Sequence, residues 1–326
     1  MNETVIRVAE ALRRAKEERS RNEIAAELGI APHMVSASIR RLRELGYRIE
    51  SPKRGLYRFD GPSKKLLPYE VKKVLKTKLI GREIRYFDKT TSTNTVAQNL
   101  LIAKDSESLH GTIVIAEEQT GGTGRLGRVW VSPGGGIWLT IILKPKIPIE
   151  RAIMLTMAGS IAVVRAIKRT TGIGALIKWP NDIYIGKKKV GGIITELSAE
   201  GSEIHHCLVG IGIDVNIPLS DLPPQLKGSV TSLSAEIGRD VDRVMLLGTL
   251  LKEFELRYFQ LEAMEYEPIL REWKSLLCTI EHRVRIRYGS RIFEGEAIDI
   301  DDFGGLLVRK DDGVVERVIA GDCTHI

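Results

Sequence analysis

The chain of 326 residues is long enough for two or three domains, and its 43% hydrophobic and 28% charged residues are typical of a globular protein that is not embedded in a membrane. The longest apolar run, IWLTIIL, is too short for a membrane span, and the N-terminus has no apolar signal region, so we expect a cytoplasmic protein. Three widely separated cysteines (Cys207, Cys278 and Cys323) fit a reducing compartment and no metal site.

The net charge of +7 is unevenly distributed along the chain. Residues 1–80 hold 19 Lys and Arg against 10 Asp and Glu, a net charge of +9, whereas the remainder has a net charge of −2. This asymmetry favours an anionic partner for the N-terminal end.

The first 59 residues predict three helices followed by a pair of strands. Apolar residues recur at helical spacing over 4–18, and residues 21–46 predict two helices joined at Gly29. Small residues at Ala25 and Gly29 would allow the two helices of a helix-turn-helix to cross closely. The segment YRIESPKRGLYRF (47–59) then predicts strand, tight basic turn and strand, which is the wing of a winged helix.

A winged helix binds DNA through the outward face of its second helix-turn-helix helix and through its wing. The residues that would contact bases and phosphates on this interpretation are His33, Ser36, Ala37, Arg40, Arg41, Lys53 and Arg54. A small helical docking module with a solvated basic face is the alternative. The segment DGPSKKLLP (60–68) has the composition of a linker, and we place the first domain boundary there.

The stretch GGTGRLGRVW (121–130) contains G-x-G-x-x-G in a context that does not fit a dinucleotide-binding turn. A plausible strand precedes it, but Pro133 and three glycines follow where that turn requires a helix. The phosphate-loop pattern fails too, because Arg128 and Val129 stand where Lys and Ser or Thr are needed. A flexible glycine loop with Arg125 and Arg128 suits a phosphate or carboxylate, and a basic surface hairpin is the alternative.

Five further segments carry structural signals. TTSTNTVAQNLL (90–101) predicts a helix capped by Thr91 or Ser92. IKWPNDIYIGKKKVGGIITEL (177–197) predicts a strand with a Pro interruption, a basic turn, and a second strand that begins on two glycines. VGIGIDVN (209–216) is a strand whose glycines leave room for something flat. Residues 239–262 predict a long amphipathic helix, and 273–326 predict a small barrel of five or six strands.

These motifs, in this order, resemble those of the biotin protein ligase family in its bifunctional, operon-repressing form. The family pattern runs S-T-N, then Q-T-x-G-R-G-R-x-G-R-x-W, then K-W-P-N-D with K-x-G-G-I, then G-I-G-I-N-V-N, and the resemblance covers nearly the whole chain. It implies an α+β protein with a winged helix-turn-helix at 1–62, a central domain at 63–272 that is similar to class II tRNA synthetases, and an SH3-like barrel at 273–326. The central sheet would be mixed, largely antiparallel and backed by helices.

The resemblance also implies an activity. The protein would activate biotin as biotinyl-5'-AMP, with ATP as co-substrate and Mg²⁺ as activator, and transfer it to a lysine of a biotin carboxyl carrier protein. It would also repress transcription as a homodimer on operator DNA, with no membrane partner. Cations suit the first step, because the biotin carboxylate must approach the α-phosphate of ATP and two anions repel each other.

Carried over position by position, the resemblance implies three groups of site residues. Lys189 and Arg125 would be catalytic, the first on the biotin carboxylate and adenylate, the second near the biotinyl phosphate. The biotin pocket would be lined by Ser92, Thr93, Asn94, Gln119, Thr123, Gly124, Arg125, Lys189 and Gly192. The nucleotide would be served by Arg128, Trp130, Asn181, Asp182, Asp214 and Asn216, with no fixed metal site and with Mg²⁺ near Asp182 or Asp214.

Two positions depart from the family pattern. Thr123 stands where the first loop arginine is expected, which removes a cation, and Asp214 stands where an Asn is expected, which adds an anion near the phosphates. Both departures concern the strength of binding more than the reaction. The glycines of 119–130 further predict a lid that is mobile in the free protein and folds over biotin and the adenylate.

Two other interpretations belong to different functional classes. A transcription regulator that senses biotin without catalysis would be favoured by loss of Lys189 or Arg125, and both are present. A tRNA-synthetase-like enzyme would need a tRNA-binding appendage, and we find none in the sequence.

Overall fold

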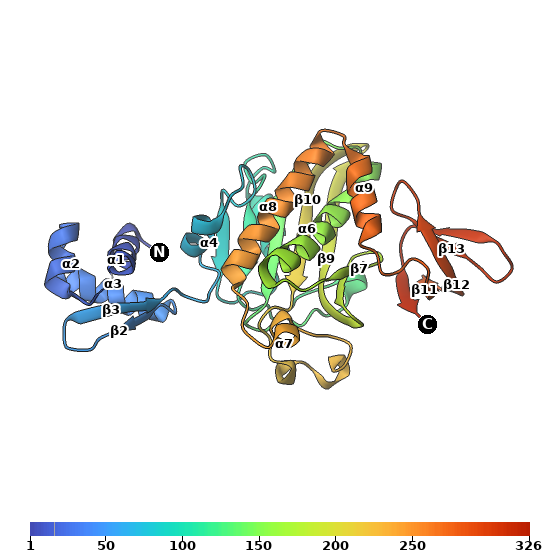
Figure 1. Cartoon of the computed structure of the whole chain (residues 1–326). Coiled ribbons are helices and arrows are strands. Elements are labelled where there is room, and N and C mark those ends of the chain that lie inside the picture. Colours follow the sequence, from blue (N-terminus) through green and yellow to red (C-terminus); the bar gives the residue numbers. More distant parts are fainter. Residues whose placement is uncertain (16) are drawn as a thin grey trace. The chain divides into compact units, whose positions relative to one another are not determined.

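The structure is a computed structural model that describes residues 1–15 and 17–326. The chain divides into two compact units, Met1–Val74 and Leu75–Ile326. Figure 1 colours both from blue at the N-terminus to red at the C-terminus. Within the described residues, no helix is both long enough and apolar enough to cross a membrane.

The first unit contains the helices and strands that the sequence predicts, together with one short additional strand, β1, and one additional helix, α4. Its elements are α1 (Glu3–Arg14), β1 (Arg19–Ser20), α2 (Arg21–Leu28), α3 (Pro32–Glu44), β2 (Arg48–Glu50), β3 (Leu56–Gly61) and α4 (Pro68–Val74). The first helix ends at Arg14, before its predicted end at residue 18, and Lys16 lies outside the described residues. Gly29 ends α2 with φ of 63°, a left-handed conformation that glycine adopts without steric cost. The three strands are ordered β1-β3-β2.

The first unit continues through the linker-like segment 60–68 into α4. Leu66, Leu67 and Val71 are buried there. Glu70 on α4 accepts hydrogen bonds from Arg13 at 2.7 Å and from the Tyr47 hydroxyl at 2.6 Å. These contacts explain why Val74, rather than a residue in the linker-like segment, is the last residue of the unit.

The second unit is built on a seven-stranded mixed sheet, as predicted, in the order β4-β5-β6-β10-β9-β8-β7. The strands are β4 (Ile84–Phe87), β5 (Ile113–Ala116), β6 (Ile137–Leu143), β7 (Leu176–Lys178), β8 (Asp182–Ile185), β9 (Lys188–Glu200) and β10 (Glu203–Ile213). β4 and β5 are parallel, and the other neighbours are antiparallel. The predicted single strand with a Pro interruption is in fact β7 and β8, because Pro180 has no N–H for the ladder and the chain turns back there.

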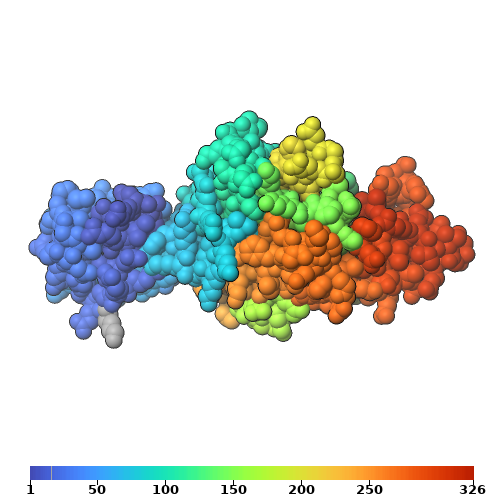
Figure 2. Space-filling view, turned by 90° about the horizontal axis from the view of Figure 1, so that it is seen from above, coloured from blue at the N-terminus to red at the C-terminus, as the bar shows by residue number. Residues whose placement is uncertain are grey.

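Helices cover both faces of the main sheet. α6 (Ile153–Thr171), α8 (Arg243–Glu262) and α9 (Tyr266–Ser275) pack together on one face (Figure 1). Figure 2 shows α8 and α9 in orange on the surface of this unit, next to the red C-terminal strands. α5 (Thr93–Ala103) packs on the other face, where Leu208 of β10 contacts it. Val209, the next residue of β10, faces α6 instead, because successive side chains of a strand alternate between the two faces.

The C-terminal strands form a second sheet in the order β14-β13-β12-β11-β15, and all its neighbours are antiparallel. The strands are β11 (Arg283–Tyr288), β12 (Arg291–Ile300), β13 (Leu306–Arg309), β14 (Val315–Val318) and β15 (Asp322–His325). Five strands agree with the predicted number. In the described part of the chain no ladder joins β14 to β15, so the sheet does not close into a barrel and the predicted SH3-like barrel is not confirmed.

Candidate active site

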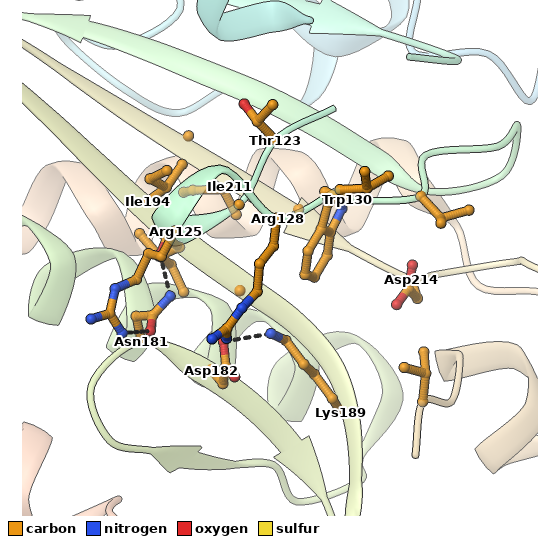
Figure 3. A pocket seen from close by; sticks show the side chains of 18 of the residues that line it. Thr123, Arg125, Arg128, Trp130, Asn181, Asp182, Lys189, Ile194, Ile211 and Asp214 are labelled. Atoms are coloured by element: carbon orange, nitrogen blue, oxygen red, sulfur yellow. Dashed lines mark hydrogen bonds and ion pairs between the residues drawn. The ribbon is translucent and has the colours of Figure 1, made fainter. Parts of the chain in front are cut away.

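A cavity of about 450 Å³ lies where the main sheet, the start of α5, the glycine-rich segment and the strand β15 meet (Figure 3). It collects the predicted biotin and nucleotide residues from six separate parts of the sequence. The predicted residues that line it are Ser92, Thr93, Asn94, Gln119, Thr123, Gly124, Arg125, Arg128, Trp130, Asn181, Asp182, Lys189, Gly192 and Asp214.

Asn216 is the predicted residue that does not line this cavity. Its Nδ2 donates to the Val241 carbonyl at 2.9 Å, and its Oδ1 accepts from the Val241 N–H at 2.8 Å. Both ends of the carboxamide therefore bind the backbone just before α8, and Asn216 holds that segment to the end of β10.

The glycine-rich segment folds as a hydrogen-bonded hairpin, which we call the glycine hairpin (residues 119–132). The Trp130 N–H donates to the Gly122 carbonyl at 2.8 Å, and the Gly124 N–H donates to the Arg128 carbonyl at 2.7 Å. A short helical turn, η1 (Arg125–Gly127), forms the tip. The chain then enters β6 without a helix, which agrees with the rejection of a dinucleotide-binding turn.

The indole of Trp130 accounts for glycines in two of the sequence motifs. Gly192 of β9 and Gly212 of β10 are paired residues, and Trp130 lies over both. A β-carbon at position 212 would come within 2.7 Å of the indole nitrogen, and one at position 192 would come within 3.5 Å of the ring. The flat group for which the Gly-Ile alternation leaves room is thus, in this conformation, a side chain of the protein itself.

The Asn-Asp pair at the start of β8 holds the two predicted catalytic cations. Asn181 accepts a hydrogen bond from Arg125 at 2.9 Å, and it donates to the Ile193 carbonyl at 2.7 Å. Asp182 forms an ion pair with Lys189, with 2.6 Å between Oδ1 and Nζ, and the Lys189 ammonium lies 5.0 Å from the centre of the Trp130 ring. Figure 3 shows both pairs as dashed lines at the floor of the cavity.

The start of β15 and the glycine before it contact the two arginines of the glycine hairpin. Arg125 donates to the Gly321 carbonyl at 3.3 Å, and Arg128 pairs with Asp322. Burial lowers the pKa of the Arg125 guanidinium, and Asp182 and Asp322 oppose that effect. Both arginines therefore donate to oxygen acceptors of the chain, and a phosphate could replace these with its own anionic oxygens.

The residues at the start of α5 are buried, and their hydrogen bonds differ from the prediction in one respect. Ser92 is the N-cap residue, but its side chain makes no capping bond. Instead, Oε1 of Gln119 accepts from the Thr93 N–H at 2.7 Å, and Nε2 of Gln119 donates to Ser132 at 2.9 Å. Thr93 is the first residue of α5, so a side chain of the glycine hairpin satisfies one of the backbone donors that are left unpaired at the start of the helix.

Asp214, the departure at the end of β10, lies in the cavity wall with 4% of its surface exposed. Burial raises the pKa of this carboxyl to about 8, and the nearby Lys189 ammonium acts in the opposite direction. Thr123, the other departure, is exposed at the top of the view in Figure 3.

Sequence reasoning missed two groups of residues that line the cavity. Gly321, Asp322, Cys323 and Thr324 come from β15 and the turn before it, and Leu222, Leu226 and Val230 come from the segment before α7 (Leu233–Ile237). Neither group forms a sequence motif of its own. Each group reaches the cavity only because the folded chain brings distant segments together.

The predicted DNA-contacting residues lie in the first unit. Along α3, Val35, Ile39 and Leu42 are buried, as predicted for its inner face. The opposite face and the turn between β2 and β3 carry the predicted set, in which Ser36 is partly exposed and His33, Ala37, Arg40, Arg41, Lys53 and Arg54 are exposed. Arg41 forms an ion pair with Glu44 at 2.9 Å.

Comparisons with known proteins decide the family. Residues 86–214 match the model of the Biotin/lipoate A/B protein ligase family, and residues 279–325 match the biotin protein ligase C terminal domain. The bifunctional ligase/repressor BirA of Bacillus subtilis (strain 168) is 38% identical over 304 residues, which are 93% of this chain and 92% of that protein. The chain belongs to the biotin protein ligase family.

Further relatives of this ligase agree with that assignment. The bifunctional ligase/repressor BirA of Escherichia coli (strain K12) is 26% identical over 305 residues, 93% of this chain and 91% of that protein. A solved structure of biotin protein ligase from Aquifex aeolicus in complex with biotin and ATP has a TM-score of 0.64 and 28% identity, and covers 74% of this chain and 98% of that chain. The resemblance found from the motifs is therefore confirmed, and the chain is a biotin ligase.

Proposed function

We propose that this ligase carries out biotinylation in two steps within the cavity. In the first step an oxygen of the biotin carboxylate attacks the α-phosphorus of ATP, the bond to the β-phosphate breaks, and pyrophosphate leaves. In the second step a lysine amine of a biotin carboxyl carrier protein attacks the carbonyl of biotinyl-5'-AMP, AMP leaves, and the amine loses a proton. The observation that carries this proposal is that Lys189 and Arg125 are held at one cavity by the Asn181–Asp182 pair.

The residues around these cations suit the first step. Lys189, Arg125 and Arg128 bring three positive charges to the place where a carboxylate must approach a triphosphate, and preorganised cations lower that electrostatic barrier. In this arrangement Lys189 would bind the biotin carboxylate and the adenylate, and the two arginines would bind phosphate oxygens.

Two carboxylates of the cavity fit a magnesium ion that arrives with ATP. Mg²⁺ takes oxygen ligands and is commonly bound by one or two carboxylates together with phosphates and water. Asp182 supplies such a group, and Asp214 would supply a second one when the cation displaces the proton of its buried carboxyl. The described residues contain no cluster of three or more His, Cys, Asp or Glu that forms a dedicated metal site. The ion would supply positive charge to the phosphates of ATP.

Other lining residues of the cavity suit biotin. Leu139, Ile194 and Ile211 provide apolar walls for a small bicyclic ring, and the polar side chains of Asn94 and Gln119 provide donors and acceptors for a ureido group. This is the composition expected of a small-molecule site in which a few polar groups fix the orientation of an apolar ligand.

Mass spectrometry of an acceptor tests the ligase proposal directly. The full-length chain is incubated with ATP, Mg²⁺, biotin and a biotin carboxyl carrier domain, and we expect a biotin-sized mass gain on one lysine with release of pyrophosphate. A carrier domain whose acceptor lysine is replaced by Arg is the control. Binding of biotin and ATP without either product would overturn the proposal and favour a sensor without catalysis.

We further propose that the first unit is a winged helix that binds operator DNA as part of a homodimer. The exposed basic face of α3, the basic turn between β2 and β3, and the net charge of +9 on residues 1–80 support this proposal. One such unit makes few base contacts, so specific binding needs two units on two half-sites. As the motif resemblance implies, adenylate in the cavity would promote the dimer.

Binding assays with Arg40→Ala test the DNA proposal. Loss of a base-contacting arginine should cost roughly tenfold or more in specific affinity, whereas loss of Lys53 or Arg54 should mainly reduce the salt dependence. Lys252→Ala on the exposed side of α8 removes one charge elsewhere and is the matched control. Equal affinity of the full-length chain for operator and random DNA, with and without biotin and ATP, would end the repressor proposal.

A further inference from the structure

We propose that Glu196 of β9 is a positioning residue for biotin, because it fixes which way the Asn94 carboxamide points. This inference rests on the proposed function, in which Asn94 lines the biotin end of the cavity. Glu196 itself does not line the cavity, and it lies three residues beyond Ile193, the last position of the K-x-G-G-I motif.

Glu196 bridges two side chains that lie one helical turn apart on α5. Its Oε1 accepts a hydrogen bond from Nδ2 of Asn94 at 2.7 Å, and its Oε2 accepts from Nε2 of Gln98 at 2.8 Å. Asn94 is 7% exposed, and Gln98 is exposed. The carboxylate therefore accepts from a buried amide at the cavity wall and from an exposed amide on the surface.

The other end of the Asn94 carboxamide meets the hydroxyl of Thr140 on β6. Oδ1 of Asn94 lies 2.5 Å from the Thr140 hydroxyl, which is fully buried and lies 2.8 Å from the Thr93 hydroxyl. The Thr140 hydroxyl has one proton, and an amide oxygen can only accept. Thr140 therefore donates that proton to Oδ1 of Asn94. Thr93 in turn contacts Oε1 of Gln119 at 3.1 Å, which connects the group to the glycine hairpin.

Of these side chains, Glu196 decides the orientation of Asn94. A hydroxyl can donate or accept, so Thr140 would accommodate either end of the Asn94 carboxamide. The exposed amide of Gln98 can rotate. A carboxylate only accepts, so a rotated Asn94 would place its own oxygen against Oε1 of Glu196 and lose a charge-assisted hydrogen bond.

Gly210 of β10 fixes the position of the same amide. A β-carbon there would come within 2.8 Å of Oδ1 of Asn94 and within 2.7 Å of Cγ2 of Ile194. The glycine thus lets the carboxamide lie against the sheet, and Glu196 sets its direction. Asn94 retains one N–H and one oxygen lone pair, and these complement the C=O and N–H groups of a cyclic urea.

Calorimetry on the full-length chain with biotin and, separately, with ATP tests this inference. Glu196→Leu removes both acceptors at similar size, and we expect biotin affinity to fall by roughly 10- to 100-fold, as for loss of a hydrogen bond to a charged group. ATP affinity should change by less than about twofold, because Glu196 lies far from Lys189 along β9. Glu196→Gln should recover most of the biotin affinity, since its Oε1 can accept from Asn94 while its Nε2 donates to a rotated Gln98.

Gln98→Leu is the matched control, because it removes the other partner of Glu196 and leaves Asn94 intact. We expect it to bind biotin within about twofold of the wild type. If Glu196→Leu does not fold, Glu196→Asp, which withdraws the carboxylate by one methylene, should weaken biotin binding and leave ATP binding unchanged.

The possible failures are distinguishable. Unchanged biotin binding by Glu196→Leu, beside tight binding by the wild type, would overturn this inference alone. If Glu196→Leu lowers biotin affinity, ATP affinity and melting temperature together, the role of Glu196 is purely structural, and this inference is overturned as well. A wild-type chain that binds no biotin would overturn the proposed function, and this inference with it.

Discussion

Lys189 donates to Asp182 across the β8–β9 pair, with 2.6 Å between Nζ and Oδ1. About a quarter of each side chain is exposed, at 25% and 27%. The ammonium that we propose for the biotin carboxylate is therefore already matched with a carboxylate of the protein. A ligand carboxylate must compete with Asp182 or share the lysine with it, and a cation at Asp182 would release Lys189 for that purpose.

Replacement of Lys189 by Ala should abolish the first step and leave the fold intact. The variant loses a cation that a carboxylate and a phosphate must both approach, and the loss of such a group costs on the order of a hundredfold or more in rate. Pyrophosphate release measures the step, and a circular dichroism melt checks the fold. Lys188→Ala is the control, since Lys188 is adjacent and does not line the cavity. Near-normal release by Lys189→Ala would refute its assignment.

Gly212→Ala should displace the glycine hairpin from the sheet. The new methyl would come within 2.7 Å of the Trp130 indole nitrogen, closer than packed atoms approach, so the indole must move. We expect faster amide hydrogen exchange across 119–130 and biotin on bystander lysines as the adenylate escapes. Gly174→Ala is the control, because nothing lies within 4 Å of its β-carbon position.

The same exchange measurement tests the predicted lid. In this conformation the hairpin is hydrogen-bonded and covers Gly192 and Gly212. A lid predicts slower exchange of amides 119–130 when biotin and ATP are added to the wild type. Equal protection with and without the ligands would mean that the segment is a rigid hairpin.

Asp214 should make the stability of the ligase depend on pH. Burial raises the pKa of its carboxyl to about 8, from an ordinary value of 3.8. The neutral acid is favoured in the folded state, so its contribution is fully present below about pH 4 and is lost as the pH rises towards 8. The side chain of the Asp214→Asn variant cannot ionise, so it does not lose this stability as the pH rises. Between pH 5 and pH 8 the free energy of unfolding of the variant should therefore increase relative to that of the wild type. The increase should be a few kcal/mol, since one pKa unit corresponds to about 1.4 kcal/mol.

Urea unfolding at the two pH values measures this difference. Asp221→Asn is a suitable control, because Asp221 is an exposed carboxyl on a nearby surface turn. A constant difference in unfolding free energy between Asp214→Asn and wild type would contradict the prediction. A Mg²⁺ titration of the first step with the same variant would show whether Asp214 also acts near the phosphates.

Asp322→Asn should loosen the glycine hairpin with little effect on global stability. The Arg128–Asp322 pair joins the hairpin to β15, and 62% of the Arg128 side chain is exposed. Exposed ion pairs contribute about 1 kcal/mol or less to folding, so the melting temperature should hardly change. Exchange of amides 124–130 should increase. Asp312→Asn, at an exposed turn of the same sheet, should leave that exchange unchanged.

Local signals in the sequence account for the elements that were predicted well. The helix end at Gly29, the inner face of α3 and the long helix α8 follow from capping residues and apolar spacing, which need no knowledge of distant partners. α6 was not identified, because 13 of its 19 residues are buried and such a helix shows no polar face. Ser92, one of the two predicted caps, is the N-cap residue but makes no capping bond, and no local signal predicts that Gln119, 26 positions from Thr93, accepts from the Thr93 N–H.

The composition of the site was predicted from motifs, but its connections were not. Lys189, Arg125 and Asp182 belong to patterns that can be read along the chain. The pairing of Gly192 with Gly212 beneath Trp130 depends on the register of two strands and on a hairpin, and neither is local. Asp322 gives no signal at all, because it reaches Arg128 only when β15 adds to the edge of its sheet.

The position of Trp130 also has an optical consequence. The chain has four tryptophans, and Trp138, Trp179 and Trp273 are 1%, 2% and 1% exposed, whereas Trp130 is partly exposed. A collisional quencher such as acrylamide would therefore reach the emission of Trp130 and leave that of the other three largely intact. A ligand that moves the Trp130 indole away from the paired glycines, or closer to them, changes the fraction of tryptophan fluorescence that acrylamide quenches. The fluorescence of the unlabelled protein therefore indicates the position of the glycine hairpin.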